Sequence, residues 1–368
     1  MKILHAGNIA NLGYFIANPL RREGVEIDLL MENHPPPEQD PLKYDPTLQN
    51  KYPDWIIFYD RKSYWKQILR VMKDRRYDLI HAHYDLAIFG HLSMRKLVSH
   101  VVGTDLRKLA FSHSIRGHLL RNAYKNSEVV IFQTPSEPPL LEKLGIQQGI
   151  FVPFPTDVTF YAPQEMPQRQ FHQELVVFHP TNLNWEKGNE ILVRGYAEFV
   201  RSNPNSLLLI VDRGEDSAKI HALVDSLEIE DKTTFIKGPL NSVELRKYYN
   251  LVDVVADQFL VPDIGSVGRE TLCAEKPLLS FCDKDGYKDL YGESPPVASA
   301  TTPSEVAGQL ERLKDEKLRR EIGREGRRWM VKYHSQQAVA RRIRAIYEGI
   351  LSGKKIQQIR EDLPKISS

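Results

Sequence analysis

The chain of 368 residues is 41% apolar and 27% charged, and its formal net charge is +2. This length exceeds what one hydrophobic core usually organises, so we expect two domains. No apolar run approaches the ~20 residues that a membrane-spanning helix needs, which excludes a helical integral membrane protein. The first residues enter a strand without the apolar region of a signal peptide. We therefore expect a cytoplasmic protein, free or peripheral on the inner face of the membrane.

Strand-like runs alternate with helical periodicity along the whole chain, which predicts parallel sheets with crossover helices. In the first half we expect strands at residues 2–6, 26–31, 55–59, 79–84, 98–102, 129–133 and 149–154. A proline-rich loop, HPPPEQDPLKYDPTLQNKYPD, separates the second strand from the third, and no helix can run through so many prolines. A loop of this length is commonly functional, although plain surface decoration fits it equally well.

Residues 155–173 contain three prolines and little apolar periodicity, so we interpret them as an interdomain linker. A second set of strands follows at residues 175–179, 207–212, 233–237, 254–258, 278–281 and 296–298. The long helical pattern of residues 318–351 is predicted to break near His334 and Ser335.

The most informative segment runs from Val254 to Leu279 and joins two apolar strands through a helix start. Asp263, Gly265 and Ser266 supply a turn and a capping signal. The N–H groups of the first helical turn, together with the positive end of the helix dipole, form a site for a diphosphate. Glu270 falls one to two turns into this helix, where a carboxylate can accept both hydroxyls of a ribose. The alternative is that Glu270 is a solvated helix residue.

This segment resembles the donor-site signature of glycosyltransferase family four, written E-x7-E followed by A-x-A-x-G-x-P. Glu270 takes the second glutamate position and Pro277 the closing proline, whereas Pro262 replaces the first glutamate and Glu275 the glycine. Some branches of the family carry a DQ-x3-G-x2-G version of the loop, which Asp257-Gln258 followed by Gly265 resembles.

The resemblance implies an α/β fold of the GT-B type. This fold has two Rossmann-like, doubly wound parallel-sheet domains that face a central cleft, and a C-terminal helix that crosses back to the first domain. The expected boundaries are residues 1–160 for the acceptor-side domain, 161–334 for the nucleotide-sugar domain and 335–368 for the returning helix. The implied reaction is metal-independent transfer of a hexose or similar sugar from a nucleoside diphosphate sugar, with retention of configuration. No organic cofactor is implied.

The strand ending at His179 leads into PTNLNWEKG, which resembles the family's phosphate-binding loop, GR-x4-KG. Lys187 and Gly188 match its second part, whereas Asn182 takes the arginine position. Lys187 could neutralise the leaving diphosphate, or it is an ordinary surface lysine at a helix start. By the resemblance, Lys187, Asn182 and the helix start at Gly265, Ser266 and Val267 hold the diphosphate, and Asp263 is a further donor-binding candidate.

The first half of the chain supplies weaker candidates. Gly7 and Asn8 follow the first strand without a GxGxxG pattern, which argues against a nicotinamide dehydrogenase. In the family, this glycine turn approaches the donor phosphates or the acceptor. DLIHAHYDL resembles the family's D-x-I-H-x-H strand end, and its His81 and His83 point to one face of the strand.

The stretch HVVGTDLR resembles the family's HGSDLR, in which the histidine lies near the transferred sugar. Val102 occupies that position, so His100 or His83 substitutes for the histidine or its function is missing. Asp105 stays in register and is expected to position a sugar hydroxyl or to hold the loop.

Signals for a metal or a nucleophile are weak. The triplet Asp283-Lys284-Asp285 matches the metal motif of a different glycosyltransferase fold, but a glycine follows it and we interpret it as a turn. Cys273 and Cys282 lie in apolar stretches without metal-ligand spacing, and we expect buried reduced thiols. We therefore assign no metal site.

Between Arg61 and Lys125 there are fourteen Lys and Arg residues against four Asp residues, an excess of ten positive charges. Aromatic and aliphatic residues interleave with these charges. The pattern predicts either a surface for anionic lipid headgroups or a solvated helix face. We expect no nucleic acid as a partner, because no recognised binding module accompanies the charge.

The function we expect is transfer of a sugar to a hydroxyl of a glycan or lipid-linked acceptor, in synthesis of a cell-surface polysaccharide or glycoconjugate. Two alternatives remain. The first is a degenerate, non-catalytic protein that binds a sugar nucleotide or a partner enzyme, which the replacements at Pro262, Asn182 and Val102 favour. The second is a sugar-nucleotide 2-epimerase on the same fold.

Overall fold

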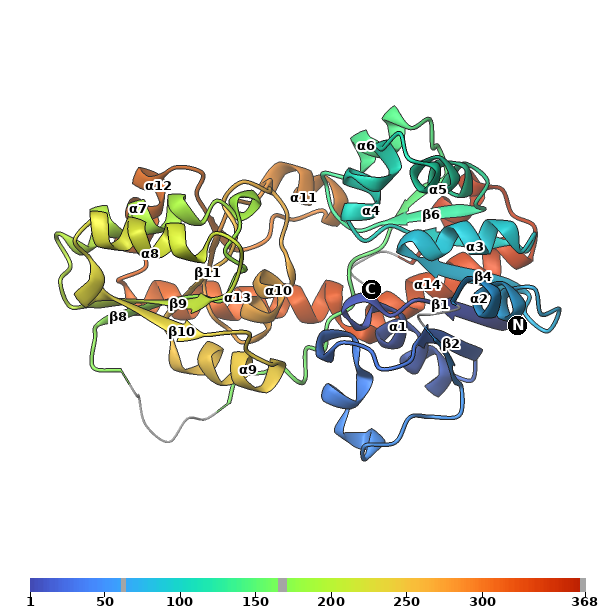
Figure 1. Cartoon of the computed structure of the whole chain (residues 1–368), viewed down its shortest axis with the longest axis horizontal. Coiled ribbons are helices and arrows are strands. Elements are labelled where there is room, and N and C mark those ends of the chain that lie inside the picture. Colours follow the sequence, from blue (N-terminus) through green and yellow to red (C-terminus); the bar gives the residue numbers. More distant parts are fainter. Residues whose placement is uncertain (61–63, 165–170, 365–368) are drawn as a thin grey trace. The chain divides into compact units, whose positions relative to one another are not determined.

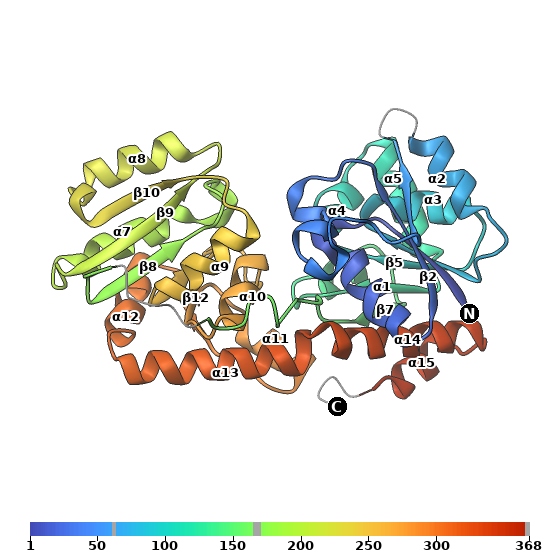
Figure 2. The ribbon, with the colours of Figure 1, turned by 90° about the horizontal axis from the view of Figure 1, so that it is seen from below.

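The computed structural model describes residues 1–60, 64–164 and 171–364 (Figures 1 and 2). The chain divides into two compact units. Unit 1 consists of Met1–Asp157 and Lys332–Ser368, and unit 2 is Val158–Val331. Arg61, Lys62 and Ser63, at the start of the basic segment, lie outside the described residues, as do 165–170 of the expected linker and 365–368 at the end of the expected returning segment.

The centre of unit 1 is a parallel sheet of seven strands in the order β3-β2-β1-β4-β5-β6-β7. The strands are β1 (Lys2–Ala6), β2 (Glu26–Glu32), β3 (Ile56–Tyr59), β4 (Leu79–His83), β5 (Leu97–His100), β6 (Val129–Phe132) and β7 (Gly149–Phe151). All the strands are parallel, so their carboxyl ends lie at one edge of the sheet, and the strand order reverses direction between β1 and β4. The expected strands of the first half are confirmed, with ends that differ by at most three residues.

Helices cover both faces of this sheet (Figure 2). They are α1 (Leu12–Arg22), α2 (Tyr64–Met72), α3 (Ala87–Leu92), α4 (Thr104–Arg107), α5 (Ile115–Lys125), α6 (Pro138–Lys143), α14 (Gln336–Leu351) and α15 (Ile356–Asp362). The proline-rich loop contains no α-helix, as expected. It forms the single 3-10 turns η2 (Pro37–Gln39), η3 (Pro41–Lys43) and η4 (Pro46–Leu48) instead.

Helix α14, from the end of the chain, is part of the core of unit 1. Its buried residues Val339, Ile343, Ile346 and Ile350 pack in one cluster with β1, α1 and the neighbouring strands. An apolar face that recurs every three to four residues explains this burial. The predicted break before α14 is confirmed, because Ser335 caps the helix by accepting from the amide of Ala338 at 3.3 Å.

Unit 2 has a parallel sheet of six strands in the order β10-β9-β8-β11-β12-β13, which repeats the arrangement of unit 1. The strands are β8 (Leu175–His179), β9 (Ser206–Asp212), β10 (Thr233–Lys237), β11 (Val254–Ala256), β12 (Leu278–Ser280) and β13 (Val297–Ser299). The α-helices of this half are α7 (Asn189–Val200), α8 (Ser217–Ser226), α9 (Ser242–Leu251), α10 (Ser266–Cys273), α11 (Lys284–Tyr291), α12 (Pro303–Arg312) and α13 (Glu316–His334), of which α13 ends in unit 1.

The core of unit 2 is built mainly from β8, β9, α7 and α12. The expected α/β fold class, with two doubly wound parallel sheets, is therefore confirmed. Within the described ranges no helix is both long enough and apolar enough to cross a membrane.

Candidate functional site

Two loops of unit 2 meet at the carboxyl ends of β8 and β11. These strands are neighbours at the point where the strand order reverses, which is where open α/β sheets bind ligands. The loop after β8 carries Asn182 and Lys187, and the loop after β11 carries Gln258 and Asp263. The structure thus brings together residues that are far apart in the sequence.

Lys187 is anchored to the second loop. It ends the single turn η7 (Trp185–Lys187), and Gly188, at φ 68°, allows the chain to enter α7 in the left-handed region that glycine tolerates best. The Lys187 ammonium Nζ donates to Oε1 of Gln258 at 2.5 Å, and the backbone carbonyl of Lys187 accepts from the amide of Phe259 at 2.8 Å. Lys187 is half-buried, so its ammonium group has a fixed position at this edge of the sheet.

Gln258 connects Lys187 to the loop before α10. Its side chain is 3% exposed, and its amide nitrogen donates to the carbonyl of Asp263 at 2.6 Å. Sequence reasoning noted Gln258 only as part of a resemblance and gave it no role. The polar pair Asp257-Gln258 at the end of an apolar strand was the signal that could have identified it.

Asp257 places a carboxylate under the start of α10. It is 2% exposed, and its Oδ1 accepts from the hydroxyl of Thr181 at 2.7 Å. No described protein group hydrogen-bonds to its Oδ2, which is also buried. A side chain at Gly265 would approach that oxygen to about 3.1 Å, which is tighter than most contacts. The glycine therefore allows the helix start to lie close to this acid.

Helix α10 begins without a side-chain cap, contrary to the expected capping signal. Gly265 takes the N-cap position, and Ser266 lies inside the helix. The Ser266 hydroxyl instead accepts from the Arg269 guanidinium at 3.2 Å, and the same guanidinium donates to the carbonyl of Ile264 at 2.9 Å. The helix start, including Val267, therefore combines uncapped N–H groups with a cation, both of which favour an anion. Sequence reasoning missed Arg269, although it precedes Glu270 directly.

Glu270 lies one turn further along α10 and is half-buried. Its Oε2 accepts from the hydroxyl of Tyr249 on α9 at 2.8 Å, and Tyr161 of the segment after unit 1 donates to the same carboxyl. Burial raises the pKa of Glu270 to about 7, although the two tyrosines and Arg269 act to lower it. Glu270 is therefore an oriented acid rather than a freely solvated one.

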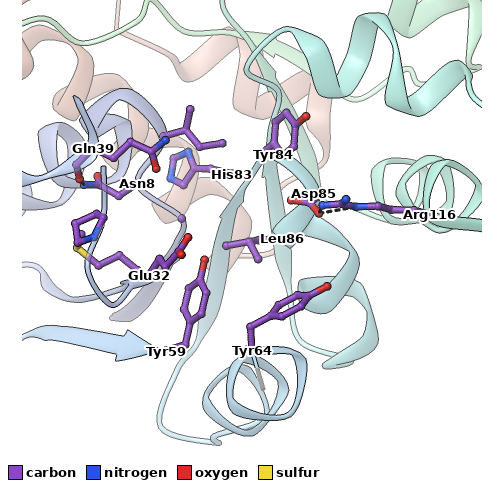
Figure 3. Close-up of a pocket in the computed structure, with 14 residues that line it drawn as sticks. Asn8, Glu32, Gln39, Tyr59, Tyr64, His83, Tyr84, Asp85, Leu86 and Arg116 are labelled. Atoms are coloured by element: carbon purple, nitrogen blue, oxygen red, sulfur yellow. Dashed lines mark hydrogen bonds and ion pairs between the residues drawn. The ribbon is translucent and has the colours of Figure 1, made fainter. Parts of the chain in front are cut away.

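Unit 1 contains a pocket of about 350 Å³ at the carboxyl ends of β1, β2, β3 and β4 (Figure 3). Gly7, Asn8 and His83 line it, as does Gln39 of the proline-rich loop. The amide nitrogen of Asn8 donates to the carbonyl of Gln39 at 2.7 Å, and its oxygen accepts from the amide of Tyr14 at 2.8 Å. Asn8 thus ties the loop and α1 to the pocket wall.

Sequence reasoning missed most of this pocket. Tyr59 and Glu32 come from the ends of β3 and β2, and Tyr84 and Asp85 follow β4. Tyr84 has φ 57°, an uncommon conformation for a bulky residue, and such strain concentrates at functional positions. The polar and aromatic residues directly after predicted strands were the available signal, because these ends meet at one edge.

A chain of hydrogen bonds connects four buried histidines near this pocket. Nδ1 of His5 lies 3.3 Å from Nε2 of His83, and Nε2 of His81 lies 3.1 Å from Nδ1 of His100. The hydroxyl of Tyr347, on α14, lies 2.6 Å from both His5 and His81 and joins the two pairs. Burial lowers the pKa of each of the four imidazoles.

The candidate residues predicted at and after the end of β5 form hydrogen bonds within unit 1. The carboxylate of Asp105 is fully buried and accepts from the Tyr124 hydroxyl at 2.6 Å and from the amide of Val102 at 3.0 Å. These bonds hold the loop after β5, which was one of the two roles expected for Asp105. Val102 keeps the place of the family's histidine, and His100 points into the histidine chain.

The remaining candidates have structural roles. Asp283 accepts from the amide of Gly286 at 3.0 Å and caps α11, so the triplet begins a helix rather than a simple turn. Cys273 and Cys282 are both buried and free. A group of three histidines, His5, His81 and His83, has the composition of a metal site among the described residues. Five of their six ring nitrogens are engaged in the hydrogen-bond chain, Nδ1 of His83 being the exception, and no carboxylate joins the group to offset the charge of a cation.

Comparisons with known proteins add to this geometry. Residues 163–329 match the family model described as Glycosyl transferases group 1. The chain is 24% identical over 308 residues to the N-acetyl-alpha-D-glucosaminyl L-malate synthase of Bacillus anthracis, covering 78% of this chain and 79% of that protein. It is 22% identical over 284 residues to the alpha-monoglucosyldiacylglycerol synthase of Acholeplasma laidlawii, covering 67% and 70%.

Solved structures show the same architecture. The structure of Anabaena HepE in complex with UDP-glucose has a TM-score of 0.72 and 17% identity, covering 95% of this chain and all of that chain. The sucrose-phosphate synthase of Thermosynechococcus elongatus has a TM-score of 0.68 and 16% identity, covering 96% of this chain and all of that chain. At these identities the likeness shows the fold, which is GT-B.

Proposed function

We propose that the chain is a retaining glycosyltransferase that uses a nucleotide sugar, a proposal that the match of residues 163–329 to the family model described as Glycosyl transferases group 1 supports. In this proposal it moves a sugar from a nucleoside diphosphate sugar to a hydroxyl of a glycan or lipid-linked acceptor. The observation that carries the proposal is the cluster of Lys187, Gln258, Arg269 and Glu270 at the switch point of the unit 2 sheet.

The roles in unit 2 follow from its charges. Lys187 and the start of α10 would bind the diphosphate, because an ammonium and uncapped N–H groups stabilise the negative charge that grows as the sugar leaves. Arg269 adds a second cation beside the same helix start. In the proposed reaction these groups supply the positive charge that a divalent metal supplies elsewhere. Asn182 would donate a hydrogen bond without charge, and Glu270 would accept the ribose hydroxyls.

Unit 1 would receive the acceptor in the pocket at Gly7 and His83. The leaving diphosphate can accept the acceptor proton in a front-face retaining reaction, so no conventional nucleophile is required. A reaction without a protein nucleophile is consistent with Val102 in place of the family's histidine. The division of the chain into an acceptor-side part and a nucleotide-sugar part remains part of the proposal.

Turnover separates the proposed enzyme from its alternatives. UDP-glucose is the first donor to test, because solved structures similar in fold bind UDP or UDP-glucose. Release of UDP that depends on an added acceptor supports the transferase. Saturable binding of UDP without turnover for any donor supports the degenerate binder, which the engagement of Asp105 and the replacement at Val102 favour. Release of nucleotide and an altered sugar without an acceptor supports the epimerase.

We predict that Glu270→Ala weakens UDP binding by about 1 to 3 kcal/mol, the cost of leaving ribose hydroxyls unpaired in a shielded site. With the pKa of Glu270 raised to about 7, the affinity of the native protein for UDP should fall as the pH drops below about 7, since protonation removes the acceptor. Calorimetry at pH 6 and pH 8 measures both effects. Glu321→Ala, on the exposed face of α13, is the control. An unchanged affinity in Glu270→Ala contradicts the ribose role.

The basic segment provides a proposed surface for anionic lipid. The helices α2, α3 and α5 pack side by side in unit 1. Large apolar side chains are exposed on these helices and the adjoining loops, namely Tyr64, Trp65, Leu92, Met94, Phe111, Ile115 and Leu119. Exposed apolar groups among Lys and Arg side chains are typical of proteins that lie on a bilayer. This proposal places the protein at the inner membrane face.

We predict that the protein cosediments with anionic but not zwitterionic vesicles and dissociates in high salt, because each basic residue contributes up to ~1 kcal/mol that salt screens. Trp65→Ala should weaken this binding, since the side chain is 51% exposed and available to the headgroup region. Trp185→Ala removes a tryptophan that is 70% exposed in unit 2 and serves as the matched control. If binding does not depend on lipid charge, or is absent at low salt, the basic segment is an ordinary solvated surface and the lipid proposal is wrong.

A further inference from the structure

The pocket of unit 1 contains charged residues that have no role in the proposed binding of the sugar donor. Its charged residues are Glu32, Asp85 and Arg116, so Arg116 is the only cationic residue among the described residues of the lining. Nε of Arg116 donates to Oδ2 of Asp85 at 2.9 Å, and its Nη2 donates to the same oxygen (Figure 3). The side chain of Asp85 is 15% exposed and that of Arg116 is 58% exposed. The acid is therefore fixed in the wall and holds the guanidinium.

The lining as a whole is negative. Burial lowers the pKa of His83 to about 3, so this imidazole is neutral at pH 7. Two carboxylates and one guanidinium leave a formal charge of −1. A carboxylate or phosphate ligand is usually bound by a cation with unused N–H donors. Here such a ligand would meet Glu32 while the guanidinium is already bound to Asp85.

The rest of the pocket suits a sugar ring. Tyr59, Tyr64 and Tyr84 contribute aromatic side chains, and the carboxylates are hydrogen-bond acceptors for hydroxyl groups. A volume of about 350 Å³ lies at the small end of the usual range for ligand sites, which fits a mono- or disaccharide unit. A ligand with an apolar ring face and several hydroxyls matches both features, whereas a compact anion matches neither.

We infer that this pocket takes a neutral sugar as the acceptor, and that Asp85 excludes anionic acceptors by occupying Arg116. The inference rests on the proposed transferase function and adds the acceptor class and a specificity-determining residue. In this proposal Asp85 acts through the guanidinium of Arg116. With Asp85 present, the charge of Arg116 is neutralised, and without Asp85 the guanidinium can bind an anion.

Two variants break the same ion pair with opposite changes in charge. Asp85→Asn raises the charge of the wall by one and frees the guanidinium, whereas Arg116→Gln lowers the charge by one and frees the carboxylate. The probes are maltose as the neutral sugar and L-malate and glycerol 3-phosphate as the anions, titrated into the full-length protein without donor and followed by ligand-observed NMR. We expect the native protein to bind maltose in preference to both anions.

Asp85→Asn should tighten binding of the anions by at least about tenfold, since a guanidinium without a counter-charge then faces the pocket. Arg116→Gln should retain maltose and gain no anion. Glu32→Gln is the charge-matched control: it raises the wall charge by one but leaves Arg116 bound, so its gain in anion affinity should be far smaller than that of Asp85→Asn. This comparison of Arg116→Gln and Glu32→Gln with the native protein also remains informative if Asp85→Asn does not fold.

The inference is wrong if the native protein binds the anions in preference to maltose. It is also wrong if Asp85→Asn leaves the affinity for the anions unchanged, or if Arg116→Gln raises that affinity as much as Asp85→Asn does. UDP release measured on the same samples keeps the proposed function separate. Absence of turnover with every acceptor contradicts the transferase but not the binding preference. Faster turnover with an anionic acceptor than with any neutral sugar overturns the acceptor class and leaves the transferase standing.

Discussion

Lys187→Met should lower kcat by about 10²- to 10³-fold while KM for the donor changes little. The negative charge on the leaving diphosphate is larger in the transition state than in the bound substrate, so a cation at this position stabilises mainly the transition state. Methionine is unbranched like lysine and only one heavy atom shorter, and it carries no charge. The hydrogen bond from Nζ to Gln258 at 2.5 Å fixes the ammonium before the donor arrives, so its contribution requires no rearrangement.

Steady-state kinetics with UDP-glucose and the best acceptor measure this effect. Lys219→Ala, which removes an exposed lysine of the same unit, is the control and should leave both parameters unchanged. A rise in KM with an unaltered kcat shows that Lys187 binds the donor equally in both states, and the leaving-group role is then wrong.

Lowering the pH from 7.5 to 5 should destabilise unit 1, and His83 alone contributes about 2 kcal/mol to this loss, which the raised pKa of Asp105 partly offsets. The pKa of His83 is about 3 in the folded protein, against an ordinary value of 6.5, because burial opposes its charge. At pH 5 the unfolded chain binds a proton that the folded chain does not, which stabilises the unfolded state by about 2 kcal/mol. His5, His81 and His100 shift in the same direction and add to the effect.

The sign follows from the direction of these shifts. Stability from the neutral histidines is fully present above pH 6.5 and is lost progressively as the pH falls toward the folded pKa values. Glu270 in unit 2 has the opposite sign, since its raised pKa removes stability as the pH rises from 4.5 to 7. His179 in unit 2 shifts in the same direction as the histidines of unit 1, so unit 2 contains groups of both signs and should lose less stability in acid than unit 1.

Hydrogen exchange followed by mass spectrometry, corrected for the intrinsic rate at each pH, resolves peptides of β1 and β4 from those of β8. His83→Asn should reduce the acid sensitivity of unit 1, whereas His113→Asn, at an exposed position, should leave it unchanged. Equal protection of β1 and β4 at both pH values contradicts the prediction.

The strands were predictable because the two sheets are parallel and buried on both faces, which leaves short apolar runs bounded by polar residues. The break at Ser335 was predictable for a local reason too, namely a capping residue inside a helical pattern. Strand ends were less certain, since β11 stops at Ala256 and the next two residues, Asp257 and Gln258, leave the sheet as site residues. Local patterns cannot tell a strand end from the polar residues that follow it.

The site was only partly predictable, because side-chain partners come from distant segments. Lys187 and Glu270 were identified through motifs, yet Gln258 lies 71 positions from Lys187 and no spacing rule connects them. The same holds for Tyr347, which lies 342 positions from His5. The missing side-chain cap of α10 was also unpredictable, since the sequence shows three residues that could occupy the N-cap and only the backbone decides among them.

The position of α14 has a consequence for synthesis. Its buried face completes the core around β1 and α1, and Thr156 pairs with Ser335 where the chain returns to unit 1. Unit 2 is continuous in sequence, whereas unit 1 needs residues from both sides of it. On the ribosome, domains generally fold as they emerge, so unit 2 has its whole sequence available first. The strands that precede unit 2 must therefore wait, with apolar surface uncovered, until helix α14 has been made after unit 2.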